Sequence, residues 1–134
     1  MRLADWKPRL IAYLAAKAPL VIEPGVHDCA LFPAGAVEAM TGIDLAADWR
    51  GRYTSFEEGF NALKAAGYRD HIDLVARHFE EIAPAFAAPG DLAVVDGPLG
   101  ASLGVVQGEG VYVLTTTRMG LLPLTHATRA FRVG

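Results

Sequence analysis

The sequence predicts an α+β fold, in which N-terminal helices pack on a small C-terminal antiparallel β-sheet. Before Pro89-Gly90, apolar residues recur at helical spacing, and after it short β-rich segments alternate with glycines. Helices followed by consecutive strands are typical of α+β domains. The chain has 134 residues, of which 52% are hydrophobic, so it can bury one core of ordinary size. We therefore expect one domain over residues 1–134.

Two helices are expected in the first third of the chain. The first should run from about Asp5 to Ala16, because Asp5 can cap it and Pro8 falls in its first turn. The second should begin at Asp28, another good N-cap residue, and end before Thr41-Gly42. Pro33 lies inside this second stretch and removes a backbone hydrogen bond, which predicts a kink or a later start.

Two further helices are expected before the sheet. Ser55 and Glu58 form a capping box for the third helix, and Gly67 would end it as a C′ residue. The fourth should begin at Asp70. The apolar residues that it would turn inward at helical spacing are Ile72, Val75, Phe79 and Ile82.

The strands are expected only after Gly90, where glycines at positions 97, 100, 108 and 110 supply turns. The segments rich in β-formers are Asp91–Val95, Ser102–Gln107, Val111–Thr116, Gly120–Pro123 and Ala130–Val133.

Composition excludes several classes of function. The net charge is −3 and the basic residues are scattered, which argues against a nucleic-acid partner. No apolar stretch approaches the roughly 20 residues that span a bilayer, so we expect no membrane insertion. Charged residues interrupt the apolar run of Met1–Ala18, unlike in a secretory signal. A lone cysteine, Cys29, cannot form an internal disulfide, which favours a reducing compartment.

No cofactor or metal is expected. The sequence contains no Walker loop, dinucleotide fingerprint or zinc motif. The acidic residues Asp44, Asp48 and Glu57 do not have the spacing of metal ligands. Asp28 and Asp91 are expected to cap a helix and to hold the turn before a strand.

Cys29 is the candidate nucleophile. It follows the N-cap Asp28, and the unpaired amides and positive dipole end of a helix start favour a thiolate. A neighbouring base normally completes the activation of such a cysteine. The alternative is that Cys29 packs as a small apolar residue.

The segment His27–Phe32 resembles the Asp-Cys segment that opens the catalytic helix of NlpC-type, papain-like cysteine peptidases. Gly90–Val95 is similar to the Gly-Asp-apolar strand that follows in that family. Ser102–Gly108 corresponds to its next strand, His-Val-Gly-Ile and a glycine turn. The resemblance covers about Trp6 to Thr116 and implies an NlpC-like fold with Cys29 in the nucleophile position.

The chain departs from this family at the other two catalytic positions. The family's histidine base falls on Ser102, or on Ala101 or Leu103 beside it, and none of these can take a proton from a thiol near neutral pH. The family's third polar residue falls near Leu114 or Thr115. Loss of general-base assistance costs about 10²–10⁴-fold in rate.

The chain has four histidines that could be considered as a replacement for this base. His27 is expected to point away from a cleft, either to solvent or packed in its loop. His71 and His78 would lie roughly 10 Å apart along the fourth helix, too far to share a metal ion, and are expected at the surface. His126 is expected in the last loop before the final strand.

In its short motifs, the sequence is even more similar to a set of phage and prophage proteins associated with tail genes. The shared segments are His27–Phe32, Thr41–Asp44, Arg50–Tyr53 and Phe131–Val133. This resemblance implies a place in the tail tip or in tail assembly, other tail proteins and peptidoglycan as partners, and a location in the virion or in the bacterial cytoplasm before assembly.

Two functions therefore stay open. The first is a catalytically inactive structural or binding module of a phage tail on an NlpC-like scaffold, and this is the one we favour. The second is a cysteine peptidase or amidase that cleaves peptidoglycan peptides with Cys29 and a base that the motif does not reveal. A histidine nitrogen next to the Cys29 sulfur would favour the second.

Overall fold

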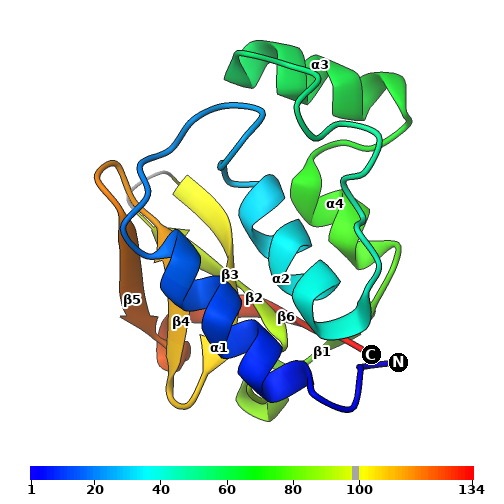
Figure 1. The fold of residues 1–134 in the computed structure, drawn as a ribbon. Coiled ribbons are helices and arrows are strands. Elements are labelled where there is room, and N and C mark those ends of the chain that lie inside the picture. Colours follow the sequence, from blue (N-terminus) through cyan, green and yellow to red (C-terminus); the bar gives the residue numbers. More distant parts are fainter. Residues whose placement is uncertain (98–99) are drawn as a thin grey trace.

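The computed structural model describes residues 1–97 and 100–134, which form four α-helices and a six-stranded antiparallel sheet (Figure 1). The predicted α+β class is confirmed. The helices are α1 (Trp6–Lys17), α2 (Leu31–Thr41), α3 (Phe56–Ala65) and α4 (His71–Ala76). Over these described ranges, no helix is both long and apolar enough to cross a bilayer.

The strands are β1 (Glu80–Ile82), β2 (Leu92–Gly97), β3 (Gly100–Gln107), β4 (Gly110–Leu114), β5 (Met119–Pro123) and β6 (Ala127–Arg132). Two 3₁₀ turns, η1 (Pro84–Phe86) and η2 (Leu124–His126), complete the second half. The order across the sheet is β1-β6-β2-β3-β4-β5, and every neighbouring pair is antiparallel. The five predicted strands correspond to β2–β6, with ends that differ by up to three residues.

The prediction that the sheet is built only after Gly90 was wrong for one strand. The fourth helix ends at Ala76, and the chain then forms β1, which pairs with β6. Ile82, predicted on the helix, faces Ala130 across this pair. Phe79 lies between the two elements and packs against the core.

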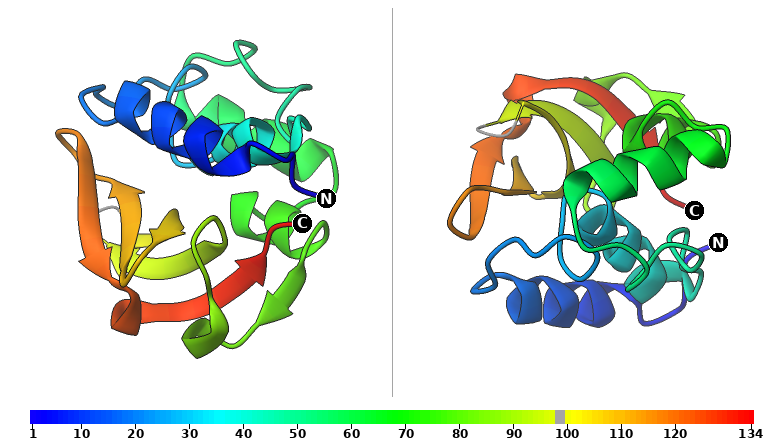
Figure 2. Two further views of the ribbon diagram at one scale, coloured as in Figure 1. Left: turned by 60° about the horizontal axis from the view of Figure 1, so that its bottom comes forward. Right: turned by 90° about the horizontal axis from the view of Figure 1, so that it is seen from above.

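Figure 2 shows a strongly curved sheet with α1 and α2 lying along one side of it. Helix α1 packs on α2, and α2 packs on β3. The approach of the two helices is close, since a Cβ on Gly35 would lie 2.2 Å from the Tyr13 hydroxyl. The core between helices and sheet is formed chiefly by Leu10, Leu14, Phe32, Val37, Met40, Leu92, Val94, Leu103, Val105 and Phe131. A second cluster, including Ala93, Val95, Val106 and Val111, fills the opposite face of the sheet.

The helix ends follow the predicted capping chemistry with two exceptions. Asp5 occupies the N-cap of α1 but makes no side-chain capping bond. Helix α2 starts at Leu31, so Pro33 falls in its first turn, where an unpaired backbone position costs little. Its C-cap is Gly42, at φ +81°.

The forward bond of the capping box and the C′ glycine of α3 are confirmed, whereas the return bond from Glu58 goes chiefly to Thr54. Ser55 Oγ accepts from the Glu58 amide at 3.1 Å. The Glu58 carboxylate accepts in turn from the hydroxyl of Thr54. Gly67, at φ +94°, donates its amide to Lys64 O at 3.0 Å and ends the helix.

The two ends of the chain lie side by side (Figures 1 and 2). Arg2 joins them, because its Nε donates to Val133 O at 2.8 Å and its Nη2 to Asp91 Oδ1 at 2.9 Å. The buried Asp91 carboxylate also accepts from the amides of Ala88 and Val133. Asp91 therefore holds the turn before β2, as predicted, and fixes both chain ends as well.

Candidate functional site

The site is organised by the buried carboxylate of Asp28, in the turn before α2. Its Oδ1 accepts from the amides of Ala30 (3.1 Å) and Leu31 (2.9 Å), and its Oδ2 accepts from the amide of Gly25 (2.9 Å) and the Tyr53 hydroxyl (2.5 Å). Asp28 is 2% exposed. The N-cap of α2 is Ala30 and not the predicted Asp28, but the Asp28 carboxylate accepts from the amides at the helix start and ties the turn to a loop 25 residues further on.

Cys29 follows Asp28 in this turn and lies just ahead of the first residue of α2. The thiol is free and half-buried. Burial raises the pKa of Cys29 above its ordinary value, and the neighbouring Asp28 carboxylate raises it further. The thiol form therefore dominates near neutral pH, in contrast to the thiolate that a helix start alone would favour.

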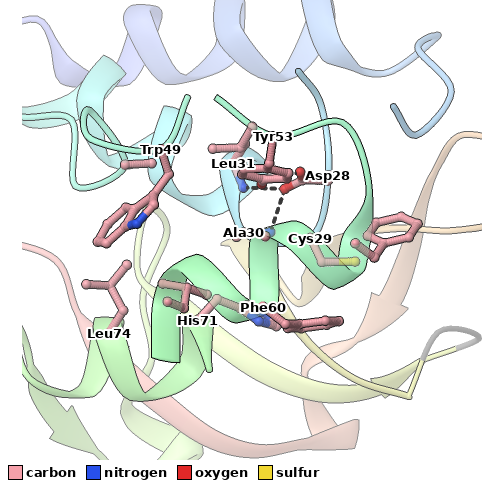
Figure 3. A pocket seen from close by; sticks show the side chains of 13 residues that line it. Asp28, Cys29, Ala30, Leu31, Trp49, Tyr53, Phe60, His71 and Leu74 are labelled. Atoms are coloured by element: carbon pink, nitrogen blue, oxygen red, sulfur yellow. Dashed lines mark hydrogen bonds between the residues drawn. The ribbon is translucent and has the colours of Figure 1, made fainter. Parts of the chain in front are cut away.

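Cys29 opens onto an apolar pocket between the start of α2, the loop that follows α2, and helices α3 and α4 (Figure 3). Its cavity volume is about 70 Å³. The large side chains on its walls are Trp49, Tyr53, Phe56, Phe60, Leu63 and Leu74. Phe56 and Phe60 lie on one side of α3 and remain 46% and 47% exposed. In the view of Figure 3, Cys29 lies toward one end of the pocket, and Trp49 and Leu74 lie toward the other.

His71, the first residue of α4, also lines this pocket (Figure 3). Its Nε2 atom is buried and has no hydrogen-bond partner among the described residues. Burial lowers the pKa of His71, so the imidazole is neutral at pH 7. The prediction that His71 lies at the surface was wrong. Side chains of α3 line the same pocket as His71, a tertiary arrangement that helical periodicity does not reveal.

The NlpC-like resemblance assigns the base to Ser102 and the third polar residue to Leu114 or Thr115. None of these residues lines the pocket. Ser102, on β3, is 5% exposed and donates its hydroxyl to Gly100 O at 3.1 Å. Leu114 is buried in the core. Thr115 accepts hydrogen bonds from the amides of Thr117 and Arg118 in the turn after β4. In the described part of the chain, none of these side chains makes a hydrogen bond to a histidine.

The remaining histidines lie outside the pocket. His27 is 2% exposed, with its ring edge against Phe32, so of the two alternatives the loop-packing one is confirmed. Its Nε2 is buried without a partner among the described residues. His78 is exposed and its Nδ1 pairs with Leu74 O at 2.7 Å, and His126 is exposed in η2. In residues 1–97 and 100–134, no three His, Cys, Asp or Glu side chains are grouped as metal ligands.

Contacts of the segments Thr41–Asp44 and Arg50–Tyr53 hold the pocket wall in place. Arg50 forms a two-pronged ion pair with Asp44, with both N···O distances at 3.0 Å. Gly51 donates its amide to Gly25 O, and Tyr53 binds Asp28. A Cβ on Gly25 would lie 2.0 Å from Tyr53 O, so the two loops pack backbone to backbone. These residues fix the loop that carries Trp49 and Tyr53 against the start of α2.

None of the curated proteins matches the chain. One family model, described as a domain of unknown function (DUF6950), matches residues 1–133. The match includes the Asp28 turn, the pocket and all six strands, and the chain therefore belongs to the DUF6950 family.

Proposed function

We propose that this chain is a structural or binding module of a phage or prophage tail, on an NlpC-like scaffold, that does not hydrolyse peptides. Its partners are other tail proteins, and its place is the virion or the bacterial cytoplasm before assembly. The observation that carries the absence of hydrolysis is the state of Cys29. A cysteine hydrolase needs a thiolate and an imidazole that returns the proton to the leaving amine.

Three features of the site support the proposal that the protein does not hydrolyse peptides. The Cys29 pKa is raised by burial and by Asp28, which disfavours the nucleophilic form. The described residues contain no hydrogen bond between Cys29 and a histidine. The Asp28 carboxylate, which could otherwise orient an imidazole, already accepts four hydrogen bonds within its own turn and from Tyr53.

The order of the elements supports the NlpC-like scaffold. Cys29 lies in the turn before the buried helix α2, a helical insert and then consecutive antiparallel strands follow, and α2 packs on β3. The association with tails rests on the resemblance of the segments His27–Phe32, Thr41–Asp44 and Arg50–Tyr53, which the Asp44–Arg50 and Asp28–Tyr53 contacts connect beside the pocket.

One observation favours the second candidate, a cysteine peptidase or amidase acting on peptidoglycan peptides. His71 and Cys29 line the same pocket, and His71 Nε2 is unpartnered among the described residues. In that case His71, from α4, would replace the strand histidine as the base. The reaction would need a movement that brings Nε2 to the sulfur and lowers the thiol pKa.

The two candidates are separated by assaying the purified protein on peptidoglycan stem peptides. We expect no hydrolysis above the blank, and the same result for Cys29→Ala and His71→Ala. Alkylation of Cys29 by iodoacetamide should rise with pH around or above the ordinary thiol value of about 8.5. Hydrolysis that is lost in both variants would show that the protein is an enzyme, and an alkylation midpoint below pH 7 would contradict the raised pKa of Cys29.

The tail assignment is tested on phage particles from the strain that encodes the chain. We expect the protein to co-purify with particles or tails at a constant ratio to the other tail proteins. A deletion should be complemented equally by the parent and by Cys29→Ser, a variant that keeps the shape but lacks the thiol. Absence of the protein from particles and from tail intermediates would contradict the assignment.

A further inference from the structure

We propose that the Asp28 turn (residues 25–31) is an acid-sensitive switch, which holds the wall of the Cys29 pocket in place near neutral pH and releases it when His27 and His71 take up protons. This inference goes beyond the association with tails and does not depend on it. It rests on two buried nitrogen atoms without partners, on the carboxylate beside both rings and on the contacts that the turn makes.

Two imidazole nitrogens are buried without a hydrogen-bond partner. Among the described residues, His27 Nε2 and His71 Nε2 are the buried side-chain nitrogen or oxygen atoms in this state. A neutral imidazole leaves one ring nitrogen unprotonated, whereas an imidazolium donates from both. Protonation would therefore put a charged donor at a position where the folded residues offer no acceptor, which is costly. The folded turn accordingly favours the neutral form of both rings.

The charges around the two rings do not reverse this preference. Burial lowers the pKa of both histidines below the ordinary value. Lys17 of α1 opposes a second positive charge on His27, whereas Asp28 favours it. Asp70 and Asp28 both favour a charge on His71. However, Asp70 is engaged as the cap of α4, and the four hydrogen bonds that Asp28 accepts occupy its lone pairs.

The other titratable groups near the rings leave the two histidines as the groups that titrate between pH 7 and 5. Glu23 pairs with His27 through its main chain only, and its side chain is exposed. Cys29 and Tyr53 line the pocket together with His71 (Figure 3). Burial raises the pKa of both, so both stay neutral in this range.

The Asp28 turn transmits a movement of these rings to the pocket wall. Gly25 donates its amide to Asp28 at 2.9 Å and accepts from the Gly51 amide at 2.8 Å, and the Tyr53 hydroxyl donates to Asp28. His27 is adjacent to Asp28 in the chain. A rotation that brings the His27 ring to water therefore displaces the carboxylate that holds Tyr53, and the loop of residues 49–53 is released from the start of α2.

The opening should be local. The buried residues of the two main core clusters are all apolar and carry no titrating group. The pocket wall rests instead on a separate, small buried cluster of Leu31, Ala34 and Ala46, against which Trp49 and Tyr53 pack. Regions with few buried apolar contacts open at a lower free energy than the whole domain.

The test measures amide hydrogen exchange of the purified chain by NMR between pH 7 and pH 5, expressed as protection factors that remove the intrinsic pH dependence of exchange. The reporters are the amides of Gly25, Leu31 and Gly51, which are bonded within the turn. Each histidine that must stay neutral raises the opening constant by up to about tenfold per pH unit below about pH 6.5. We expect the three protection factors to fall at least about tenfold over this range. The Val106 amide, bonded to Asp91 O in the sheet, should remain at least about tenfold better protected at pH 5.

Double variants assign the effect to the two histidines. His27→Gln with His71→Gln removes both titrating groups and should leave a decline of less than about threefold. His27→Leu with His71→Leu should do the same without any polar atom, and provides a second route if the first pair does not fold. His78→Gln with His126→Gln is the matched control, because both of these histidines are exposed, and should retain the decline of the parent. Circular dichroism shows which variants are folded.

The imidazole resonances of the parent give a check that needs no variant, since both rings should titrate below about pH 6.5. The proposal is overturned if either ring titrates at or above that value, or if the reporter amides keep their protection to pH 5. A decline that persists in a folded double variant would assign it to another group, such as the Asp28 carboxylate, and overturn it as well. Equal protection of Val106 and the reporters at pH 5 would show global unfolding in place of a local switch.

Discussion

Asp28→Ala removes a buried carboxylate that accepts hydrogen bonds from the amides of Gly25, Ala30 and Leu31 and from the Tyr53 hydroxyl. Loss of an N-cap side chain costs about 1 kcal/mol. A buried donor left without an acceptor costs about 1–3 kcal/mol, and Gly25 and Tyr53 would each lose their acceptor. Relief of the cost of burying a charge offsets part of this sum. We therefore expect a loss of about 3–5 kcal/mol in the free energy of unfolding.

Such a loss is a large fraction of the 5–15 kcal/mol typical of a folded domain. Urea unfolding followed by circular dichroism and tryptophan fluorescence measures it directly. Tyr53→Phe removes one of the four hydrogen bonds and should cost about 1 kcal/mol. Asp48→Ala is the matched control, because Asp48 is exposed in the same region, and its effect should stay within about 0.5 kcal/mol.

A second measurement follows from the charge of Asp28. Its carboxylate contributes to the raised pKa of Cys29, so the folded Asp28→Asn variant should alkylate faster than the parent at pH 8. A cost below about 1 kcal/mol for Asp28→Ala, or an unchanged alkylation rate in Asp28→Asn, would refute the role given to this carboxylate.

Two further changes probe other parts of the structure. Arg2→Ala should cost about 2 kcal/mol in urea unfolding, because Asp91 loses its ion-pair partner and Val133 O loses a donor; an unchanged midpoint would contradict this. Burial lowers the pKa of His27 and His71, so the unfolded state takes up protons first as the pH falls. The free energy of unfolding should be highest above about pH 6.5 and decline below it. His71→Leu should flatten this decline between pH 6.5 and 5. A pH profile of the variant that runs parallel to that of the parent would exclude His71 as a cause.

Local chemistry predicted the parts of the fold that depend on neighbouring residues. The Ser55–Glu58 capping bond and the C′ glycine Gly67 each involve only residues a few positions apart, and both are present. The strands after Gly90 follow one another as neighbours for most of the sheet, so alternating apolar residues and glycine turns were enough to find them. The hydrogen bonds that Asp28 accepts from the amides of Ala30 and Leu31 have the same local origin.

Non-local pairing explains what the sequence did not reveal. Strand β1 exists because its partner β6 lies about 50 residues later, with Glu81 and Arg129 paired across the two strands at 2.8 Å. Helical spacing continues through Ile82, so periodicity favoured a longer helix there. The pocket likewise combines side chains of α3 with the start of α4, so that His71, which was expected at the surface, shares a site with Cys29. The hydrogen bond between Tyr53 and Asp28, 25 residues apart, has no sequence signature of its own.

The pairing of the chain ends by Arg2 gives the molecule two separate poles, the chain ends and the pocket. Leu3 donates its amide to Met40 O near the end of α2, whereas the pocket lies at the start of the same helix. An 11-residue helix is roughly 16 Å long, so this distance separates the two poles. A fluorophore, an affinity tag or a neighbouring domain attached at either end would therefore emerge on the same side and leave the pocket open. Tethering the protein through its ends would present the pocket outward to whatever approaches it.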